Sequence, residues 1–76
     1  MRIERTMKYA IVIEKAESDY SAYVLDLPGC VATGNTIEQA QAQIREAISF
    51  HLQGLREDGL PIQESSSSIA YVEVTD

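Results

Sequence analysis

Residues 26–40, DLPGCVATGNTIEQA, combine a strand end, two turns and a helix start, and they indicate how a sheet and a helix are joined in this chain. Pro28 has no amide donor and Gly29 permits positive φ, so the pair predicts a tight turn. We expect this turn, formed by Leu27, Pro28, Gly29 and Cys30, to be architectural. Leu27 should pack beneath the helix that follows.

A helix over roughly residues 36–57 is predicted by its capping residues and by its apolar period. Thr36 stands three residues before Gln39, which fits a capping box. Gly59 and then Pro61 mark the stop, in the order expected for a glycine just past a helix end. Apolar residues recur between these signals at helical spacing, at Ile37, Ala40, Ile44, Ala47, Ile48, Leu52 and Leu55.

Two strands are expected before this stretch, and two short ones flank the helix. Residues 7–15 alternate large apolar side chains with smaller or charged ones, and residues 20–27 place Tyr23, Leu25 and Leu27 on one expected face. A polar turn joins these strands into a hairpin. The remaining strands are expected at residues 30–33 and 69–74.

The predicted fold class is α+β, in the order β-β-β-α-β, with one helix packed on one face of a small, mainly antiparallel sheet. A chain of 76 residues can build one modest core, so we expect a single domain over residues 1–76. Residues 1–6 are expected to be a flexible extension, and the serine-rich residues 64–68 a flexible connector.

The amino-acid composition disfavours several classes of function. Twelve acidic and six basic side chains give a formal net charge of −6, which repels phosphate backbones and favours cationic partners. Direct nucleic-acid binding is therefore not expected. A single cysteine cannot form an internal disulfide, and no secretion signal or apolar run of about 20 residues is present. We expect a cytoplasmic protein with no membrane contact.

The residue types that carry catalysis do not form a recognisable pattern. His51 is the one histidine, and we expect it at the edge of the helix's apolar stripe. We expect Cys30 to be a buried packing residue. No ligands stand at metal-binding spacing, so no metal, cofactor or catalytic residue is predicted. The enzyme hypothesis left open is a divalent-metal nuclease, which would use some of Glu14, Asp26, Glu46 and Glu73.

Apolar residues occur on both faces of the first and last expected strands. One helix can cover only one face, which leaves Ala10, Val12, Val72 and Val74, or else the residues on the opposite face of these strands, without cover. We take the first set as the expected oligomer face. We therefore expect at least a dimer, joined through this face or through an edge strand.

The stretch 26–40 resembles the DLPGC…G-T-x-E-E-A signature of the HicB-like antitoxin family. The resemblance extends over about residues 7–63. Residues 9–14 are similar to the family's opening strand, 20–24 to its second strand, and 59–62 to the motif that closes its helix. The resemblance implies a partial RNase H fold that retains the sheet and helix without a working nuclease site.

The resemblance also implies a partner, because HicB-like domains commonly bind and neutralise a small basic HicA-type mRNA interferase with a catalytic histidine. An acidic surface suits such a partner independently. We expect the partner contacts at Glu17, Asp19, Tyr23 and Asp26. The alternative is a stand-alone oligomeric regulator or small-molecule-binding domain without a toxin.

The sequence departs from the family pattern at its C-terminus. Many members continue into a helix-turn-helix or ribbon-helix-helix domain that binds the operator, whereas this sequence ends at Asp76. We therefore expect a solitary member that does not contact the operator directly.

Overall fold

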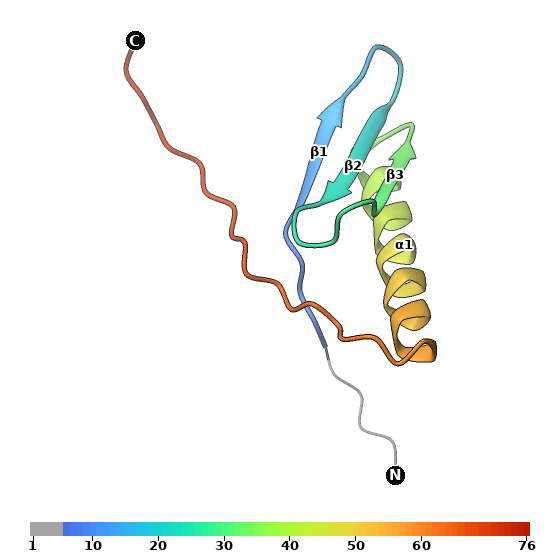
Figure 1. Ribbon diagram of the computed structural model, residues 1–76. Helices are drawn as coiled ribbons and strands as arrows, with labels where there is room; N and C mark the ends of the chain where they lie inside the picture. The colour runs from blue at the N-terminus through green and yellow to red at the C-terminus, as the bar shows by residue number, and fades with distance from the viewer. Residues whose placement is uncertain (1–5) are drawn as a thin grey trace.

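The computed structural model describes residues 6–76, and the expected extension at 1–6 lies almost wholly outside them. The elements are β1 (Ile11–Lys15), β2 (Tyr20–Val24), β3 (Val31–Gly34) and α1 (Ile37–Glu57). Residues 6–76 form an antiparallel sheet of order β1-β2-β3 with α1 across one face (Figure 1). This arrangement confirms the α+β class.

Strand register determines which side chains reach the helix. Ile11 lies opposite Val24 and Ile13 opposite Ala22, and these residues face α1 as part of the core. Val12 lies opposite Tyr23 on the outer face, where Tyr23 is 37% exposed. The expectation that Tyr23, Leu25 and Leu27 share a face is wrong. β2 ends at Val24, and the turn beyond it brings Leu27 into the core while Leu25 stays 40% exposed.

The helix begins and ends at its predicted capping residues. Thr36 Oγ1 accepts a hydrogen bond from the Gln39 amide at 3.0 Å, and the Gln39 side chain accepts one from the Asn35 amide. Gly59 has φ +67°, its amide donates to the Arg56 carbonyl, and the Leu60 amide donates to the Leu55 carbonyl. These two bonds form a Schellman motif, which satisfies the last carbonyls of α1.

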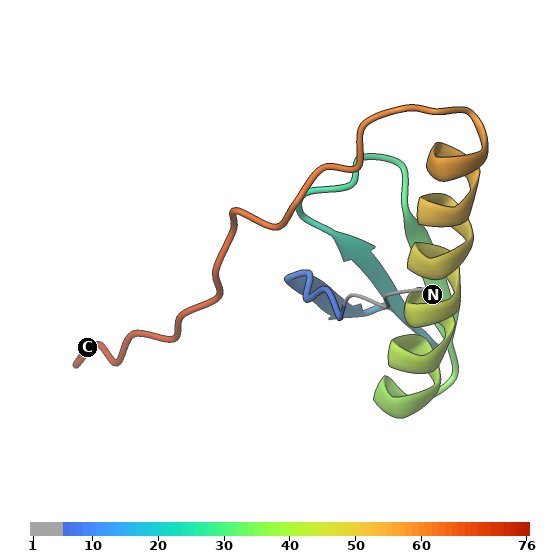
Figure 2. The ribbon, with the colours of Figure 1, turned by 90° about the horizontal axis from the view of Figure 1, so that it is seen from below.

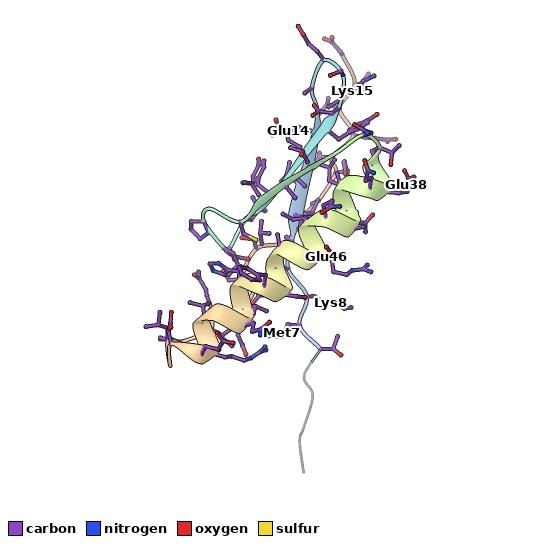
Figure 3. The ribbon with its side chains drawn as sticks, turned by 90° about the vertical axis from the view of Figure 1, so that its right-hand side faces the viewer. Met7, Lys8, Glu14, Lys15, Glu38 and Glu46 are labelled. Atoms are coloured by element: carbon purple, nitrogen blue, oxygen red, sulfur yellow. The ribbon has the colours of Figure 1, made fainter. Side chains whose placement is uncertain are left out.

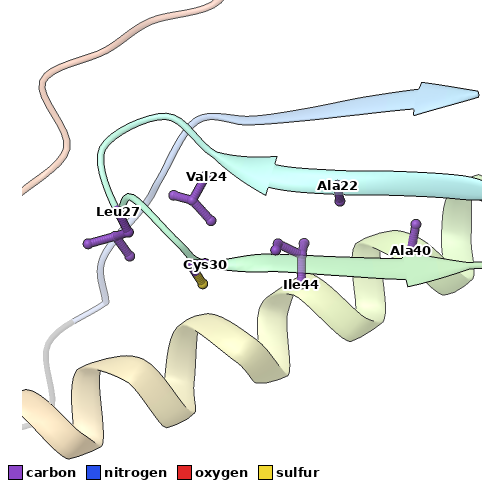
Figure 4. Packing of buried hydrophobic residues seen from close by; sticks show 6 residues of the cluster. All are labelled: Ala22, Val24, Leu27, Cys30, Ala40 and Ile44. Carbon is purple, nitrogen blue, oxygen red and sulfur yellow. The ribbon is translucent and has the colours of Figure 1, made fainter.

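The core lies between the sheet and α1 (Figure 4). Ala22 and Val24 come from β2, and Ala40 and Ile44 from α1; the loop between β2 and β3 adds Leu27 and Cys30. The helix packs mainly against β3 and β2 and touches β1 least. The inner side of β1 is therefore only partly covered.

The predicted fourth strand at residues 69–74 is wrong for the single chain. Residues 60–76 are neither helix nor strand, and Tyr71, Val72 and Val74 are 96%, 81% and 83% exposed. The segment runs away from the sheet as an extended chain (Figures 1 and 2). A strand needs a hydrogen-bonded neighbour, and residues 69–74 have none because this segment leaves the domain without lying beside β1.

Candidate functional site

The turn between β2 and β3 has type II geometry. The Cys30 amide donates to the Leu27 carbonyl at 3.1 Å, and Gly29 has φ +84° between them. Proline at the second position and glycine at the third suit this turn type. The Val24 amide donates to the Cys30 carbonyl at 3.2 Å and closes the loop at the sheet. The loop is thereby held in one conformation, with Asp26 at its start.

Asp26 lies at the centre of a cluster of serines from the segment that follows α1 in the sequence. Its carboxylate accepts hydrogen bonds from the amides of Ser66 and Ser67, both at 3.1 Å. Three hydroxyls also donate to it, from Ser65 and Ser66 at 3.2 Å and from Ser67 at 2.9 Å. Asp26 is only 7% exposed. We call Asp26 with Ser65, Ser66 and Ser67 the serine anchor.

The serine anchor changes the role expected for the connector. The segment after α1 is held at two places, since the Tyr9 hydroxyl also donates to the Gln63 carbonyl at 2.6 Å. Residues 63–67 are therefore tied to the domain, in contrast to the flexible connector expected from serine content. Amides and hydroxyls around one carboxylate form the kind of concave site that stabilises an anion.

The hydrogen bonds of the anchor lower the pKa of Asp26. The backbone hydrogen bond from Ser67 lowers it most, desolvation opposes this, and the remaining bonds from Ser66 and Ser67 lower it further. An ionised Asp26 is thus engaged within its own chain. It does not present a free carboxylate to a partner.

The four residues expected to contact a partner do not lie together. Glu17 is exposed and Asp19 half-buried in the turn that precedes β2, and Tyr23 is on the outer face of β2. Asp26 lies beyond the opposite end of β2, a strand of five residues that spans roughly 17 Å. Glu17 and Asp19 share the β1–β2 turn, whereas Tyr23 lies on the outer face near the other end of β2.

The four carboxylates of the nuclease hypothesis are dispersed. Glu14 is on β1, whereas Glu46 is exposed on α1 (Figure 3). Asp26 is in the serine anchor and Glu73 is in the extended tail. Across the part of the chain that the structure describes, no three His, Cys, Asp or Glu side chains are placed to hold a metal ion. A two-metal site requires such convergence.

His51 and Cys30 occupy the positions of packing residues. Cys30 is 5% exposed within the core, and burial raises the pKa of its thiol. His51 is half-buried on α1 and lines a shallow hollow with Cys30, Val31 and Phe50. Phe50 is 81% exposed beside it.

The residues of the expected oligomer face fall into two separate groups. Ala10 and Val12 are half-buried on the outer side of the sheet, by alternation with Ile11. Val72 and Val74 lie on the extended tail. A single chain does not bring the two groups together.

The structure places no membrane-spanning element in the domain, since within residues 6–76 no helix is long and apolar enough to cross a bilayer. The 21 residues of α1 carry charged side chains along their exposed side, including Glu38 and Glu46.

Comparison with known proteins gives a family match over nearly the whole domain. A family model described as "HicB_like antitoxin of bacterial toxin-antitoxin system" matches residues 9–76. An uncharacterized 14.9 kDa protein from the rep-hol intergenic region of Haemophilus phage HP1 is 39% identical over 66 residues, 87% of this chain and 50% of the relative. The chain thus spans half the length of that phage protein. A UPF0150 protein of Helicobacter pylori strain J99 is 42% identical over 83% of this chain and 89% of the relative.

Two solved structures resemble the domain in three dimensions. The N-terminal domain of Burkholderia pseudomallei antitoxin HicB superposes with a TM-score of 0.70 at 33% identity, over 79% of this chain and 70% of that one. A chain of the HicA3 and HicB3 toxin-antitoxin complex superposes with a TM-score of 0.63 at 29% identity, over 82% of this chain and 70% of that one.

Proposed function

The chain belongs to the HicB-like antitoxin family, and from this premise we propose that it binds and neutralises a small basic HicA-type mRNA interferase. The observation that carries the proposal is the likeness, over 82% of this chain, to a chain of a solved toxin-antitoxin complex. The net charge of −6 supports it, because opposite potentials accelerate the encounter of an acidic and a basic protein.

The surface we assign to the toxin is the β1–β2 turn together with the adjoining outer face of the sheet. It presents Glu17 and Asp19 in the turn and, farther along the outer face of β2, the ring of Tyr23, which is 37% exposed. Both groups suit a basic partner, because the carboxylates can form ion pairs with lysine and arginine side chains and an exposed aromatic ring can contact a cation with its face. Asp26 is left out of this surface because its carboxylate is held by the serine anchor.

In this proposal the antitoxin neutralises the toxin by occupying its RNA-binding surface. The antitoxin covers the basic surface with which the toxin would bind RNA, and no bond is made or broken by the antitoxin. The dispersal of Glu14, Asp26, Glu46 and Glu73 agrees with such a role, since a mechanism based on binding requires no convergent carboxylates.

The test is to look beside this gene for one that encodes a short basic protein and to co-express the two proteins; a gene without such a neighbour would favour the stand-alone regulator. We expect the two proteins to co-purify, the toxin alone to arrest growth, and the purified pair to lack the toxin's RNase activity. Full RNase activity in the presence of excess antitoxin would refute neutralisation, and it would leave the stand-alone regulator as the better reading.

Charge reversal locates the surface. The double variant Glu17→Lys with Asp19→Lys should weaken toxin binding by at least about tenfold, because it places cations against a basic partner. The control is Glu46→Lys with Glu57→Lys on α1, which changes the net charge by the same amount in the middle and at the far end of the helix, away from the turn. Equal weakening by both variants would mean that overall charge, and not this surface, determines binding.

A further inference from the structure

The segment 69–76, which we call the tail, has the sequence of a strand but lies beside none. It reads IAYVEVTD, rich in the β-branched and aromatic residues that favour sheets. Tyr71, Val72 and Val74 are each more than 80% exposed. A contiguous exposed segment of this kind marks an interaction surface.

One edge of the sheet is available to receive a strand. β1 pairs with β2 on one side, and on its other side it lies beside no described strand. Such an edge presents a row of N–H and C=O groups that can template a further strand. β3 forms the other edge, but α1 lies mainly against β3.

A hollow of about 510 Å³ lies beneath α1, beside the start of β1 and the residues that precede it, where Met7, Tyr9 and Ile11 line it. It exists because α1 packs over β3 and β2 and leaves the inner side of β1 partly uncovered. Its apolar lining includes Ile11, Ile44, Ile48 and Leu52. We call this hollow the β1 groove.

The charges of the tail and of the β1 groove are opposite. Arg45 and Arg56 line the groove, and among the described residues that line it none is acidic. The tail contains Glu73 and Asp76 and no lysine or arginine. Opposite charges at the rim of an apolar contact favour one partner and one register.

Strand alternation then divides the tail into two sides. With Ile69, Tyr71 and Glu73 turned inward, two apolar side chains meet the apolar lining and the carboxylate meets the arginines. The other side carries Val72 and Val74, which continue the outer face that Ala10 and Val12 begin. The two groups of apolar residues that a single chain leaves apart become one surface.

The serine anchor indicates which chain supplies the tail that fills a given β1 groove. Ser65, Ser66 and Ser67 are held at Asp26, and from there the chain's own tail leaves the sheet (Figures 1 and 2). The chain's own groove is therefore open while its tail is extended. A two-fold arrangement lets each of two chains fill the groove of the other with one repeated contact.

We propose that two copies of this chain form a dimer by exchanging tails, each tail adding as a strand to β1 of the partner copy and covering its β1 groove. The proposal does not rest on toxin binding. Its tests contain no toxin, so it can fail while the proposed function stands.

The first test mixes two charge variants. The tail variant carries Glu73→Lys with Thr75→Lys, both on the inward side of the tail, and the groove variant carries Arg45→Glu with Arg56→Glu. Each alone sets like charges against each other, so each should dimerise at least about tenfold more weakly than the native chain in sedimentation velocity. Mixed together, they form a heterodimer in which both contacts again join opposite charges. Dimerisation should then recover toward the native level.

The mixing result distinguishes tails that are exchanged between two chains from a tail that docks in the groove of its own chain. A tail that folds back on its own groove cannot gain from mixing, and its strand would protect the amides of residues 69–74 in the monomer. No gain on mixing, protected tail amides in a monomer, or a native chain that stays monomeric from micromolar to millimolar concentration would each overturn the proposal.

The second test removes one backbone donor from the tail. Val72→Pro cannot complete a strand ladder, and because Val72 is 81% exposed it should leave the core intact. We expect this variant to be monomeric at concentrations where the native chain is a dimer, with the helical signal of α1 in its far-UV circular dichroism spectrum retained. Val72→Thr is the control, since it keeps the branched shape and the amide, and it should still dimerise. A dimer that survives Val72→Pro would place the contact elsewhere and refute tail exchange.

Discussion

Asp26 and Ser67 are 41 positions apart, yet the Asp26 carboxylate accepts two hydrogen bonds from Ser67, from its amide at 3.1 Å and from its hydroxyl at 2.9 Å. This pair ties the loop after β2 to the segment that follows α1. The anchor thereby fixes the direction in which the tail leaves the domain.

Acid should release this anchor. Its hydrogen bonds lower the pKa of Asp26, chiefly the backbone bond from Ser67. A carboxyl group with a lower pKa in the folded state stabilises that state fully above its unfolded pKa of about 3.9, and this stabilisation is lost as pH falls toward the folded pKa. We expect amide protection factors at Ser66 and Ser67 to fall below about pH 4, before those of α1.

Removing the charge should have the same effect at neutral pH. Asp26→Asn keeps the shape of the side chain but weakens its charge-assisted bonds, so protection at Ser66 and Ser67 should drop by about tenfold and lose its acid dependence. Asp19→Asn, before the opposite end of β2, is the control and should change neither. Retained protection in Asp26→Asn would show that the serines are held by something else.

Gly34 and Gly54 should respond oppositely to alanine. A Cβ at Gly34 would lie 2.8 Å from the Gln39 carbonyl carbon and 2.9 Å from the Ala40 Cα, so the start of α1 must shift. Gly34→Ala should cost about 1–3 kcal/mol of unfolding free energy. At Gly54 no described atom lies within 4 Å of such a Cβ, and Gly54→Ala should stabilise by up to about 1 kcal/mol.

Urea unfolding at one protein concentration measures both variants, so that any dimerisation contributes equally. Destabilisation by Gly54→Ala would indicate that another backbone approaches this glycine in an assembly. A neutral Gly34→Ala would mean that β3 and α1 are packed less closely than the structure shows.

The elements that follow local rules were predictable from the sequence. Thr36 and Gly59 bound α1 because capping and positive φ depend on residues within one turn. The hairpin of β1 and β2 follows from alternation and a short polar turn. These signals depend on the sequence within a few positions.

The serine anchor and the tail could not be predicted in this way. The bonds of Asp26 join residues 39 to 41 positions apart, and a run of serines in a sequence signals only a polar segment. The alternation at residues 69–74 correctly indicates strand propensity, but a strand also requires a neighbour. Likewise, a count of carboxylates does not reveal that Asp26 is engaged while Glu17 is exposed.

Cys30 should be almost inert in the folded protein. It is 5% exposed and burial raises the pKa of its thiol, so little thiolate is present or reachable near neutral pH. Labelling by Ellman's reagent should be at least about a hundredfold slower than in the urea-unfolded chain. Equal labelling rates in the two states would contradict the placement of Cys30 in the core.

Gly29 provides a test of backbone strain without a change in packing. It has φ +84°, and no described atom lies within 4 Å of a Cβ built on it. The added Cβ therefore meets no neighbour, but Gly29→Val forces a β-branched residue into a region that such residues avoid. The free energy of unfolding should fall by about 1–3 kcal/mol, measured by urea and thermal unfolding.

Gly29→Asn is the matched control, because asparagine tolerates positive φ and also adds a Cβ. It should cost clearly less than valine, and the difference between the two variants isolates the backbone term. The turn also closes the loop that begins at Asp26, so strain at Gly29 should lower amide protection at Ser67 in the valine variant more than in the asparagine variant. Equal stability of all three chains would show that the loop adopts another turn type, with φ at this position negative.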